Sequence, residues 1–361
     1  MDAKRIKEIM SRKEEHISIC LGRQVSFTNS GTLFDCVRLL NEALPEMNLD
    51  DIDTSTTFLG HKFSAPLMAG AMTGGAELAS KINSNIAEAV EELGLGMVLG
   101  SQRAGLYDKA LADTYSIARK RAPTAFIGSN VGGAQLSGGL GVEESRKLLK
   151  MLDADALYVH LNPLQEIVQP EGEPSYRGVA SRITEIARAI DKPIVAKEVG
   201  SGISGRTAKR LEAAGVKAIE VAGSGGVSYS AVEYYRAAEQ KMQAKEAVGK
   251  LFWNWGIPTA AAVRMASGAV KIPVVASGGI RNGQEMAKSI ALGASMCATA
   301  LPLLKPATVS SQKVKETMEQ MIYELKVTMF LTGCRNMKDL GKAPFAITGE
   351  LKEYLDTMKN G

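Results

Sequence analysis

The sequence is poor in cysteine, which argues against a disulfide framework or a cysteine-metal framework. Its 361 residues contain four cysteines, at positions 20, 36, 297 and 334, and no pair has the spacing of metal ligands. A chain of this length can bury a large core and needs no disulfides. Cys297 lies within an apolar run, so we expect it to be a buried free thiol.

Long hydrophobic runs are also missing. No segment approaches the roughly 20 consecutive apolar residues that cross a bilayer. The first residues, Met1–Arg5, are charged and are not followed by an apolar stretch, so we expect no signal peptide. These absences predict a soluble cytoplasmic protein without a membrane partner.

Charge of one sign is not in excess either. The formal net charge is +4, and the basic residues are spread along the chain. This balance argues against a dedicated nucleic-acid surface, and we expect no nucleic-acid partner. It remains compatible with a local site for an anion.

The sequence does contain a repeated alternation of short apolar runs and helical patterns. Eight runs recur between Ala65 and Ala300, and all but one precede a segment with a helical pattern. Most starts lie about 25 to 40 residues apart, the length of a strand and a returning helix. The repeat predicts an α/β fold of the TIM (β/α)8 barrel type, with its chemistry at the carboxyl ends of the strands. The runs are Ala65–Ala69, Gly96–Gly100, Ala125–Ser129, Ala156–His160, Pro193–Val199, Ala218–Ala222, Ile272–Ser277 and Ser295–Ala300.

We expect a single barrel domain over residues 1–361, because a barrel with extensions normally has this length. Residues 1–60 form an N-terminal extension that we expect to contribute to the functional site. Within it, residues 34–41 have the pattern of a short helix, and residues 48–60 suggest small strands under the barrel floor. Residues 308–331 predict one long C-terminal helix that covers the barrel.

A long insertion interrupts the rhythm after the sixth run. Residues 226–258 are too many for a single helix and suggest a lid or an oligomer contact. We interpret most of the charged run Arg236–Lys250 as a solvated helix face. Trp253 and Trp255 are expected to anchor the loop, with stacking on a ligand as the alternative.

The segments after the seventh and eighth runs predict a phosphate site. TIM barrels often bind phosphate there through backbone N–H groups and the start of a helix. Ser277-Gly278-Gly279-Ile280-Arg281 offers two glycines and a cation, and Ala300-Leu301 adds small residues. The alternative is a tight turn with a surface arginine.

A phosphate at this position is typical of a mononucleotide such as FMN. Lys197, at the end of the fifth run, is placed to meet the flavin edge that carries negative charge in the reduced state. Its alternative partner is Glu220 on the neighbouring run. Met72-Thr73, Ser101 and Asn130 also follow runs and are candidates for bonds to the ring.

Two further groups are candidates for binding a second anion. The fourth run leads into the polar block His160 to Glu166, where Glu166 is a candidate Mg²⁺ ligand rather than a surface side chain. Outside the barrel, Arg12, Lys13 and His16 provide charges that suit a diphosphate, and Arg103 would extend that clamp. Taken alone, Arg12-Lys13 indicates only a surface charge pair.

Together these motifs resemble those of the type 2, flavin-dependent isopentenyl-diphosphate isomerases, from Arg12 to about Gly341. The polar block after the fourth run is the most specific of them. The motifs are Arg12-Lys13-x-x-His16-Ile17, Met72-Thr73-Gly74-Gly75, Gly100-Ser101-Gln102-Arg103, Asn130-x-Gly132, His160-Leu161-Asn162-Pro163-Leu164-Gln165-Glu166, Lys197-Glu198-Val199-Gly200, Ser277-Gly278-Gly279-Ile280-Arg281 and Ala300-x-Pro302.

The resemblance implies that isopentenyl and dimethylallyl diphosphate are interconverted without net redox change. It implies reduced FMN and Mg²⁺ as cofactors, NADPH as the reductant, and a homotetramer or homo-octamer. The implied catalytic residues are Gln165, His160 and Asn162, with Glu166 as the metal ligand. The implied substrate contacts are Arg12, Lys13, His16, Ser101, Gln102, Arg103 and Gln165. The implied flavin contacts are Ala71, Met72, Thr73, Ser101, Asn130, Lys197, Gly279, Ile280, Arg281, Ala300 and Leu301.

One loop departs from the family pattern. The family usually has Ser-Gly-x-Gly-Gly-Thr after the sixth strand, with both hydroxyls on FMN, whereas this chain has Ala222 and Val227 at those two positions. Backbone N–H groups remain, and Ser224 and Ser228 are candidates to replace the hydroxyls.

Two other functions remain as alternatives. The first is an FMN-dependent oxidoreductase of the 2-hydroxyacid oxidase or glutamate synthase barrel type. It is disfavoured because the three histidines, at 16, 61 and 160, all precede the seventh run, where such oxidases carry their base. The second is a nucleotide-binding barrel without catalysis.

Overall fold

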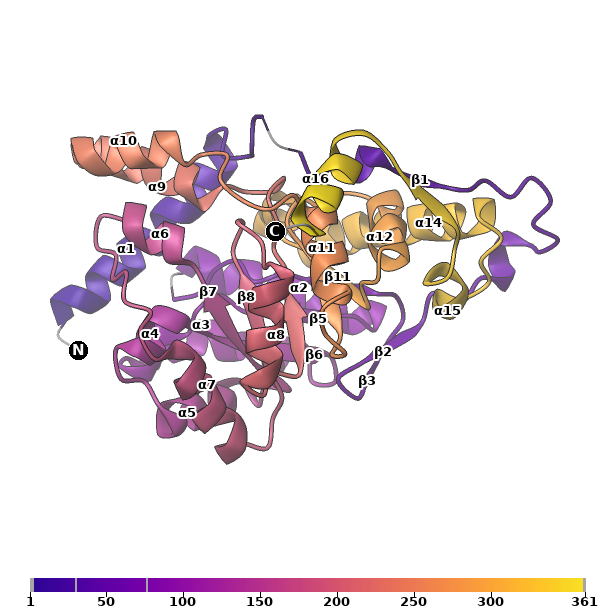
Figure 1. Ribbon diagram of the computed structural model, residues 1–361. Coiled ribbons are helices and arrows are strands. Elements are labelled where there is room, and N and C mark those ends of the chain that lie inside the picture. Colours follow the sequence, from indigo (N-terminus) through magenta and orange to yellow (C-terminus); the bar gives the residue numbers. More distant parts are fainter. Residues whose placement is uncertain (1–2, 30, 76, 360–361) are drawn as a thin grey trace.

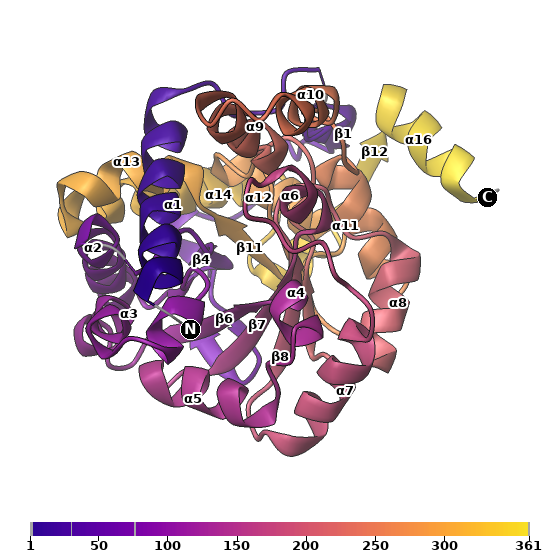
Figure 2. The same cartoon turned by 90° about the vertical axis from the view of Figure 1, so that its left-hand side faces the viewer.

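The computed structural model describes residues 3–29, 31–75 and 77–359, and its centre is a closed barrel of eight parallel strands (Figures 1 and 2). Around the barrel the strands follow the order β10-β11-β4-β5-β6-β7-β8-β9. Each predicted apolar run contains or overlaps one of these strands, so the TIM-barrel prediction is confirmed. The strands are β4 Leu67–Ala69, β5 Gly96–Val98, β6 Phe126–Gly132, β7 Ala156–Leu161, β8 Ile194–Glu198, β9 Ala218–Glu220, β10 Val274–Ala276 and β11 Met296–Thr299.

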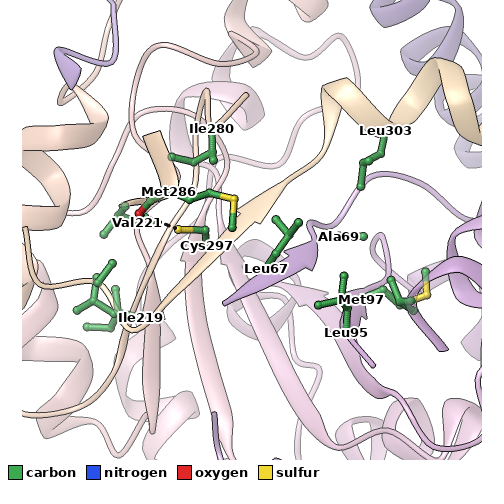
Figure 3. Packing of buried hydrophobic residues seen from close by; sticks show 14 of the residues in the cluster. Leu67, Ala69, Leu95, Met97, Ile219, Val221, Ile280, Met286, Cys297 and Leu303 are labelled. Atoms are coloured by element: carbon green, nitrogen blue, oxygen red, sulfur yellow. Dashed lines mark hydrogen bonds between the residues drawn. The ribbon is translucent and has the colours of Figure 1, made fainter. Parts of the chain in front are cut away.

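Alternating side chains of these strands belong to two separate cores. Met68 points into the barrel, while Leu67 and Ala69 point outward to the helices, because successive strand residues face opposite sides. Figure 3 shows part of the outer core, including Cys297, whose thiol lies 3.9 Å from the carbonyl oxygen of Met286. Cys297 is a buried free thiol, as expected.

Helices surround the barrel, and Figure 2 shows them as a ring around the strands. Their apolar faces pack on the outward side chains of the strands, which gives the usual layering of this fold. The ring consists of α2 Glu77–Leu93, α3 Lys109–Arg121, α5 Val142–Leu152, α7 Val179–Ala189, α8 Gly205–Ala213, α11 Thr259–Ser267, α12 Gly283–Ala291 and α14 Ser311–Leu331.

A hairpin closes the amino end of the barrel. Strands β2 (Thr56–Phe58) and β3 (His61–Phe63) pair antiparallel after the short 3-10 turn η2 (Leu49–Asp51). The rings of Phe58 and Phe63 each lie 5.8 Å from the ring of Phe126, at the start of β6. These small strands agree with the expectation for residues 48–60, and they leave the opposite end of the barrel for the site.

The opposite end is covered by helices from distant parts of the chain. These are α1 (Ala3–Gly22), α4 (Gly133–Ser137), α6 (Pro163–Val168), α9 (Tyr229–Glu239) and α10 (Gln243–Leu251), all facing the viewer or bordering that face in Figure 2. Helices α9 and α10 form the insertion after the sixth barrel strand. A short turn, η3 (Arg103–Leu106), follows β5 on the same side.

The segment at 34–41 is mostly not a helix, contrary to expectation. A 3-10 turn, η1 (Phe34–Cys36), leads directly into strand β1 (Val37–Leu39), which pairs antiparallel with β12 (Phe345–Ile347). The partner strand lies about 300 residues further along the chain, so a local sequence pattern could not reveal it. Two short helices, α15 (Met337–Leu340) and α16 (Gly349–Lys359), flank β12.

The long helix expected over residues 308–331 is present as α14, which begins slightly later, at Ser311, because a separate short helix precedes it. Helix α13 (Leu301–Val309) ends at Ser310, whose backbone is extended. The hydroxyl of Ser310 then accepts a hydrogen bond from the N–H of Lys313 and caps α14. Among the helices of the described ranges, none is long and apolar enough to span a membrane.

Candidate active site

A cavity of about 410 Å³ opens at the carboxyl ends of the barrel strands. Its walls come from α1, from the loops after the strands and from α9, so side chains that lie far apart in the sequence meet there. The predicted site residues that line it are Arg12, Lys13, His16, Ala71, Met72, Thr73, Ser101, Arg103, Asn130, His160, Asn162, Gln165, Glu166, Lys197, Gly279, Ile280, Arg281, Ala300 and Leu301.

Gln102 is the exception among the predicted site residues, because it does not line the cavity. The side chain is fully buried and points away from the cavity. Its Oε1 accepts hydrogen bonds from the Ser129 hydroxyl at 2.5 Å and from the Asn130 N–H at 2.9 Å. Gln102 therefore holds the loop after β5 onto β6, a role that its neighbours in the motif did not reveal.

Three polar side chains form a ring inside the barrel mouth. His160, Lys197 and Glu220 occupy aligned positions on β7, β8 and β9, so their side chains share one level of the interior. Lys197 Nζ lies 3.8 Å from Glu220 Oε1 and donates to the carbonyl of Glu198 at 2.6 Å. Lys197 therefore pairs with Glu220, its alternative partner, and it also lines the cavity, so its contact with a flavin stays a prediction.

His160 is held as a neutral ring. Its Nδ1 lies 2.7 Å from Asn130 Oδ1, and Asn130 Nδ2 donates to the carbonyl of Leu99, so the oxygen is the end that faces the histidine. Nδ1 must then carry the proton. Burial, followed by the charges of Lys197 and Arg12, lowers the pKa of His160 to about 3.

Asn162 organises the polar block after β7. Its Nδ2 lies 3.0 Å from Gln165 Oε1 and 3.2 Å from Glu166 Oε1, while its Oδ1 accepts from the Tyr176 hydroxyl at 2.7 Å. Pro163 opens α6 at its first turn, where its missing N–H costs nothing. These bonds fix the first turn of α6 and orient both side chains that follow.

Gln165 also contacts a buried carboxylate that the sequence analysis missed. Its Nε2 donates to Glu233 Oε1 at 3.0 Å, and His16 Nε2 lies 2.9 Å from the same oxygen. Burial alone would raise the pKa of Glu233, but His16 and then Arg236 outweigh it and hold this pKa at about 2. Glu233 is therefore a fixed negative charge behind Gln165.

Most charged side chains of the run 236–250 are exposed or half-buried, as expected, and Arg236 is the exception. It is only 3% exposed, and its guanidinium lies 2.7 Å from Glu15, 3.1 Å from Glu171 and 2.8 Å from Glu233. The Arg236 guanidinium therefore links three segments, which are α1, the loop after α6, and helix α9 itself. No local signal distinguishes Arg236 from its neighbours, because its burial comes from α1 and from the segment after α6.

Three cations from two segments, α1 and η3, line the cavity. Arg12 lies 3.6 Å from Glu171, and Arg103 lies 3.6 Å from Glu173. Lys13 is buried, and burial followed by the charge of Arg12 holds its pKa well below the usual value. Adjacent cations of this kind are stabilised by a polyanionic ligand.

Glycines of the loops after β9 and β10 form a cradle that also lines the cavity. A side chain at Gly226 would place its Cβ 2.6 Å from the amide nitrogen of Gly279, and one at Gly278 would lie 2.1 Å from the carbonyl of Gly223. Both Gly278 and Gly279 have positive φ angles, which glycine adopts without strain. Arg281 ties the two loops by donating to the carbonyls of Gly225 and Gly279.

Neither Ser224 nor Ser228 replaces the two hydroxyl groups that the family pattern has at positions 222 and 227. Ser228 caps α9 and donates to the carbonyl of Trp253 at 2.7 Å. Ser224 is fully buried, and its hydroxyl is one of the buried polar atoms that have no hydrogen-bond partner. The phosphate interactions that remain available are those of backbone N–H groups and Arg281.

The cavity fits FMN in two further respects. The hydroxyl of Thr73 and the second carboxylate oxygen of Glu220 are buried without a hydrogen-bond partner, and both residues line the cavity. Buried polar atoms normally have partners, so these atoms indicate a polar ligand. The glycine cradle and Lys197 lie on the same cavity, as a flavin with a phosphate tail requires.

Glu166 provides one carboxylate to the cavity. Its Oε1 faces Asn162, and its Oε2 accepts from the N–H of Glu173 at 2.8 Å. The part of the chain that the structure describes holds no cluster of three or more histidine, cysteine or acidic residues suited to a metal. A Mg²⁺ ion here would need water and ligand oxygens to complete its shell.

The two tryptophans differ in their environments. The indole N–H of Trp253 donates to the carbonyl of Ser26 at 3.0 Å, so Trp253 anchors the insertion on the N-terminal extension as expected. Trp255 is 61% exposed, and its ring lies 5.5 Å from that of Phe252. It is therefore not a buried anchor.

The comparisons with known proteins agree with this geometry. The chain matches the family described as FMN-dependent dehydrogenase over residues 6–115 and 160–346. A barrel with a glycine cradle and a lysine at its mouth is what such a flavin protein needs, and the chain belongs to this family.

Individual relatives identify the family of this chain more narrowly within that class of flavin proteins. The chain is 44% identical over 345 residues to the isopentenyl-diphosphate delta-isomerase of Methanosarcina mazei, covering 96% of this chain and 94% of the relative. It is 43% identical to the enzyme of that name from Archaeoglobus fulgidus, covering 96% and 98%. The chain therefore belongs to the isopentenyl-diphosphate delta-isomerase family, in its FMN-dependent, type 2 branch.

Solved structures support the fold alone. A putative lactate oxidase of Pediococcus acidilactici superposes with a TM-score of 0.65 at 15% identity, covering 95% of this chain and 94% of that one. A mandelate oxidase variant superposes with a TM-score of 0.63, also at 15% identity, covering 95% and 100%. These oxidases share the barrel architecture with this chain.

Proposed function

We propose that this protein interconverts isopentenyl diphosphate and dimethylallyl diphosphate, using reduced FMN and Mg²⁺. The observation that supports the proposal is that one cavity is lined by two sets of groups suited to anions. One set is the glycine loop at Gly278-Gly279, and the other is the cations Arg12, Lys13 and Arg103. A flavin nucleotide and a diphosphate ester bound together need both sets.

The residues that would hold FMN come from the strand ends. The cradle and Arg281 would bind its phosphate, Lys197 its pyrimidine edge, and Thr73 the opposite edge, where its hydroxyl lacks a partner. When bound and reduced, FMN supplies an electron-rich ring that can give and recover a proton and stabilise positive charge. Isomerisation needs such a group because ordinary side chains are weak acids toward an alkene.

The substrate diphosphate would bind between α1 and the loop after β5. Arg12, Lys13 and Arg103 supply its positive partners, and Glu166 would share a Mg²⁺ ion with the diphosphate oxygens. Glu171 and Glu173 now pair with the two arginines, so these carboxylates would be displaced or shared when substrate binds.

Gln165 would lie beside the carbon skeleton of the substrate. The interactions with Asn162 and Glu233 fix both ends of its amide, so its orientation does not depend on the ligand. His160 and Asn162 would complete the polar wall. Because His160 is neutral and carries its proton on Nδ1, its Nε2 is a hydrogen-bond acceptor and does not by itself attract an anion.

Three finer expectations belong to the same proposal. NADPH is the proposed reductant of the flavin, and cytoplasmic location and a homotetramer or homo-octamer remain proposed. Reduction by NADPH is tested by following loss of the oxidised flavin absorbance without oxygen. Light scattering of the purified protein tests the oligomer.

The two alternative functions are less well supported. An oxidase of the 2-hydroxyacid type needs a histidine base after β10, and the chain has histidines only at 16, 61 and 160. A nucleotide-binding barrel without catalysis does not explain the cations that line the same cavity as the cradle.

The decisive experiment is an assay of the purified, FMN-loaded protein under anaerobic conditions. With dithionite-reduced flavin and Mg²⁺, we expect isopentenyl diphosphate to convert to dimethylallyl diphosphate, and we expect oxidised flavin to give no turnover. Bound flavin without isomerisation after reduction would favour the non-catalytic alternative. In a separate aerobic assay, oxygen-dependent oxidation of 2-hydroxyacids would favour the oxidase.

A further inference from the structure

Tyr115 lies against Lys13, one of the cations that line the cavity. It is on α3 and is fully buried. Its ring fills the space beside the loop after β4, where a Cβ at Gly74 would lie 1.9 Å from a ring carbon. The next residue, Gly75, donates its N–H to the Thr114 hydroxyl at 3.0 Å. The glycine pair that follows Met72-Thr73 is thus explained by α3 packing against it.

The hydroxyl of Tyr115 meets the buried amine of Lys13. It donates to the carbonyl of Ser101 at 2.8 Å, and Lys13 Nζ donates to the same carbonyl at 2.9 Å. Lys13 Nζ also contacts the phenol oxygen directly. Because the phenol proton goes to Ser101, the phenol oxygen is free to accept from the lysine.

This arrangement leaves one N–H of Lys13 for a ligand. An ammonium has three donors, and the Ser101 carbonyl and the Tyr115 hydroxyl use two of them. Lys13 lines the cavity beside Arg12, so its third donor can reach an anion there. Fixing the amine in advance reduces the entropy cost of binding that anion.

We propose that Tyr115 is a positioning residue for diphosphate binding, which holds the Lys13 ammonium through its hydroxyl while its ring secures the loop that carries Thr73. The inference rests on the proposed function and adds to it a residue outside the cavity. Tyr115 acts through Lys13, so it affects affinity for the diphosphate and leaves the reacting carbons untouched.

The role of the hydroxyl predicts a change in affinity for the diphosphate alone. Hydrogen bonds to charged groups contribute more than neutral ones, so Tyr115→Phe is expected to weaken pyrophosphate binding by about 10-fold. The phenyl ring still fills the space beside Gly74, so FMN affinity should change less than about 2-fold. In the isomerase assay KM should rise and kcat should remain within about 3-fold.

The test is calorimetric titration of the FMN-loaded, full-length protein with inorganic pyrophosphate and Mg²⁺. It compares wild type with Tyr115→Phe, Lys13→Met and the double variant. We expect Tyr115→Phe to have no further effect once Lys13 is replaced, because the hydroxyl acts through the amine. Equal losses in both backgrounds would overturn the proposal, since they would indicate a structural effect alone.

A pH series gives a second readout that a structural defect would not change. Burial lowers the pKa of Lys13, and the phenol oxygen favours its charged form. Loss of the hydroxyl should therefore move the alkaline decline of pyrophosphate affinity to lower pH. An unchanged decline, together with wild-type affinity, would also overturn the proposal.

Tyr158→Phe is the matched control. Tyr158 is equally buried, and its hydroxyl lies 3.7 Å from Met68 Sδ in the barrel core. We expect it to bind pyrophosphate as the wild type does. Because pyrophosphate binding is measured without turnover, failure of this inference is distinct from failure of the isomerase assignment, which would leave binding intact and abolish conversion.

Discussion

At the residue scale, the site depends on side chains whose charge and orientation are set before a ligand arrives. Gln165 is held by Asn162 and Glu233. His160 is neutral because of burial and neighbouring cations. Each of these properties can be tested by a substitution that leaves the barrel intact.

Gln165→Ala removes the amide expected beside the substrate carbons. We expect turnover of isopentenyl diphosphate to fall about 100-fold, the lower range for loss of a group that acts in the reaction. The flavin spectrum should persist, since the cradle lies on other loops. Steady-state kinetics and absorbance of the same sample measure both, and near wild-type turnover would contradict the assignment.

Glu166→Ala removes the single acidic side chain proposed to hold Mg²⁺. We expect the Mg²⁺ concentration for half-maximal activity to rise at least 10-fold, because water and diphosphate oxygens alone would hold the ion. Titration of activity with Mg²⁺ at saturating substrate measures this. Ile167→Ala is the neighbouring control, since this side chain is exposed. The same midpoint in wild type and Glu166→Ala would remove Glu166 as a ligand.

His160 should make stability sensitive to acid. Its pKa is lowered to about 3 by burial and by nearby cations, whereas an unfolded histidine titrates near 6.5. Between these two pKa values only the unfolded chain binds the proton. The contribution of His160 to the unfolding free energy is therefore complete above pH 6.5 and is lost as pH falls towards 3. Relative to His160→Asn, the unfolding free energy of wild type should fall by on the order of 1 kcal/mol per pH unit.

Urea denaturation at pH 4.5, 5.5, 6.5 and 8 measures this difference. Burial raises the pKa of Glu198 to about 7, although three backbone N–H groups donate to the carboxylate. The contribution of Glu198 to the unfolding free energy therefore falls as pH rises, opposite to that of His160. It is present in both proteins and cancels in the comparison. Parallel pH profiles for wild type and His160→Asn would show that His160 is not held neutral.

At the element scale, the active face is assembled from helices that the barrel repeat does not include. Helices α1 and α9 and the segment after α6 meet through Arg236 and its three carboxylate partners. Since α1 carries Arg12, Lys13 and His16, its attachment positions the proposed diphosphate site.

Arg236→Met should loosen α1 while the barrel stays folded. The change leaves Glu233 and Glu171 without their buried cation, and breaking one side of such a network costs roughly 3–5 kcal/mol. We expect faster hydrogen exchange in peptides from residues 10–22, with little change in the barrel strands, measured by mass spectrometry. Lys250→Met removes the same charge from an exposed position and is the control. Unchanged exchange in α1 would argue against this attachment.

At the scale of the whole molecule, strand ends from the full length of the barrel contribute to one ligand pocket. Binding of FMN should therefore stabilise the entire fold. For a ligand at 100 times its Kd the expected gain is about 2.7 kcal/mol.

Thermal melts of flavin-free protein with increasing FMN test this coupling. We expect the transition temperature to rise with FMN concentration, because the native state alone binds the ligand. Riboflavin lacks the phosphate and should give a smaller rise at equal concentration, since it does not use the glycine cradle. Equal effects of the two ligands would contradict a phosphate site at Gly278-Gly279.

Local patterns were sufficient for much of this protein. The eight apolar runs predicted the strands because buried parallel strands need short, continuous apolar segments, whatever their partners. The polar residues at the strand ends followed from the same reasoning, since carboxyl ends of barrel strands meet on one face. His160, Lys197 and the loop at Gly278 could therefore be placed on that face from their positions in the sequence alone.

The tertiary structure decided what depends on distant partners. Gln102 turned inward because Ser129 and the Asn130 amide lie beside it, and Arg236 became buried because α1 and the segment after α6 pack over it. Strand β1 formed because residues 345–347 offered it a partner. Side-chain burial and pairing are properties of the folded neighbourhood, so a periodic pattern along the chain specifies the scaffold but leaves these individual environments undetermined.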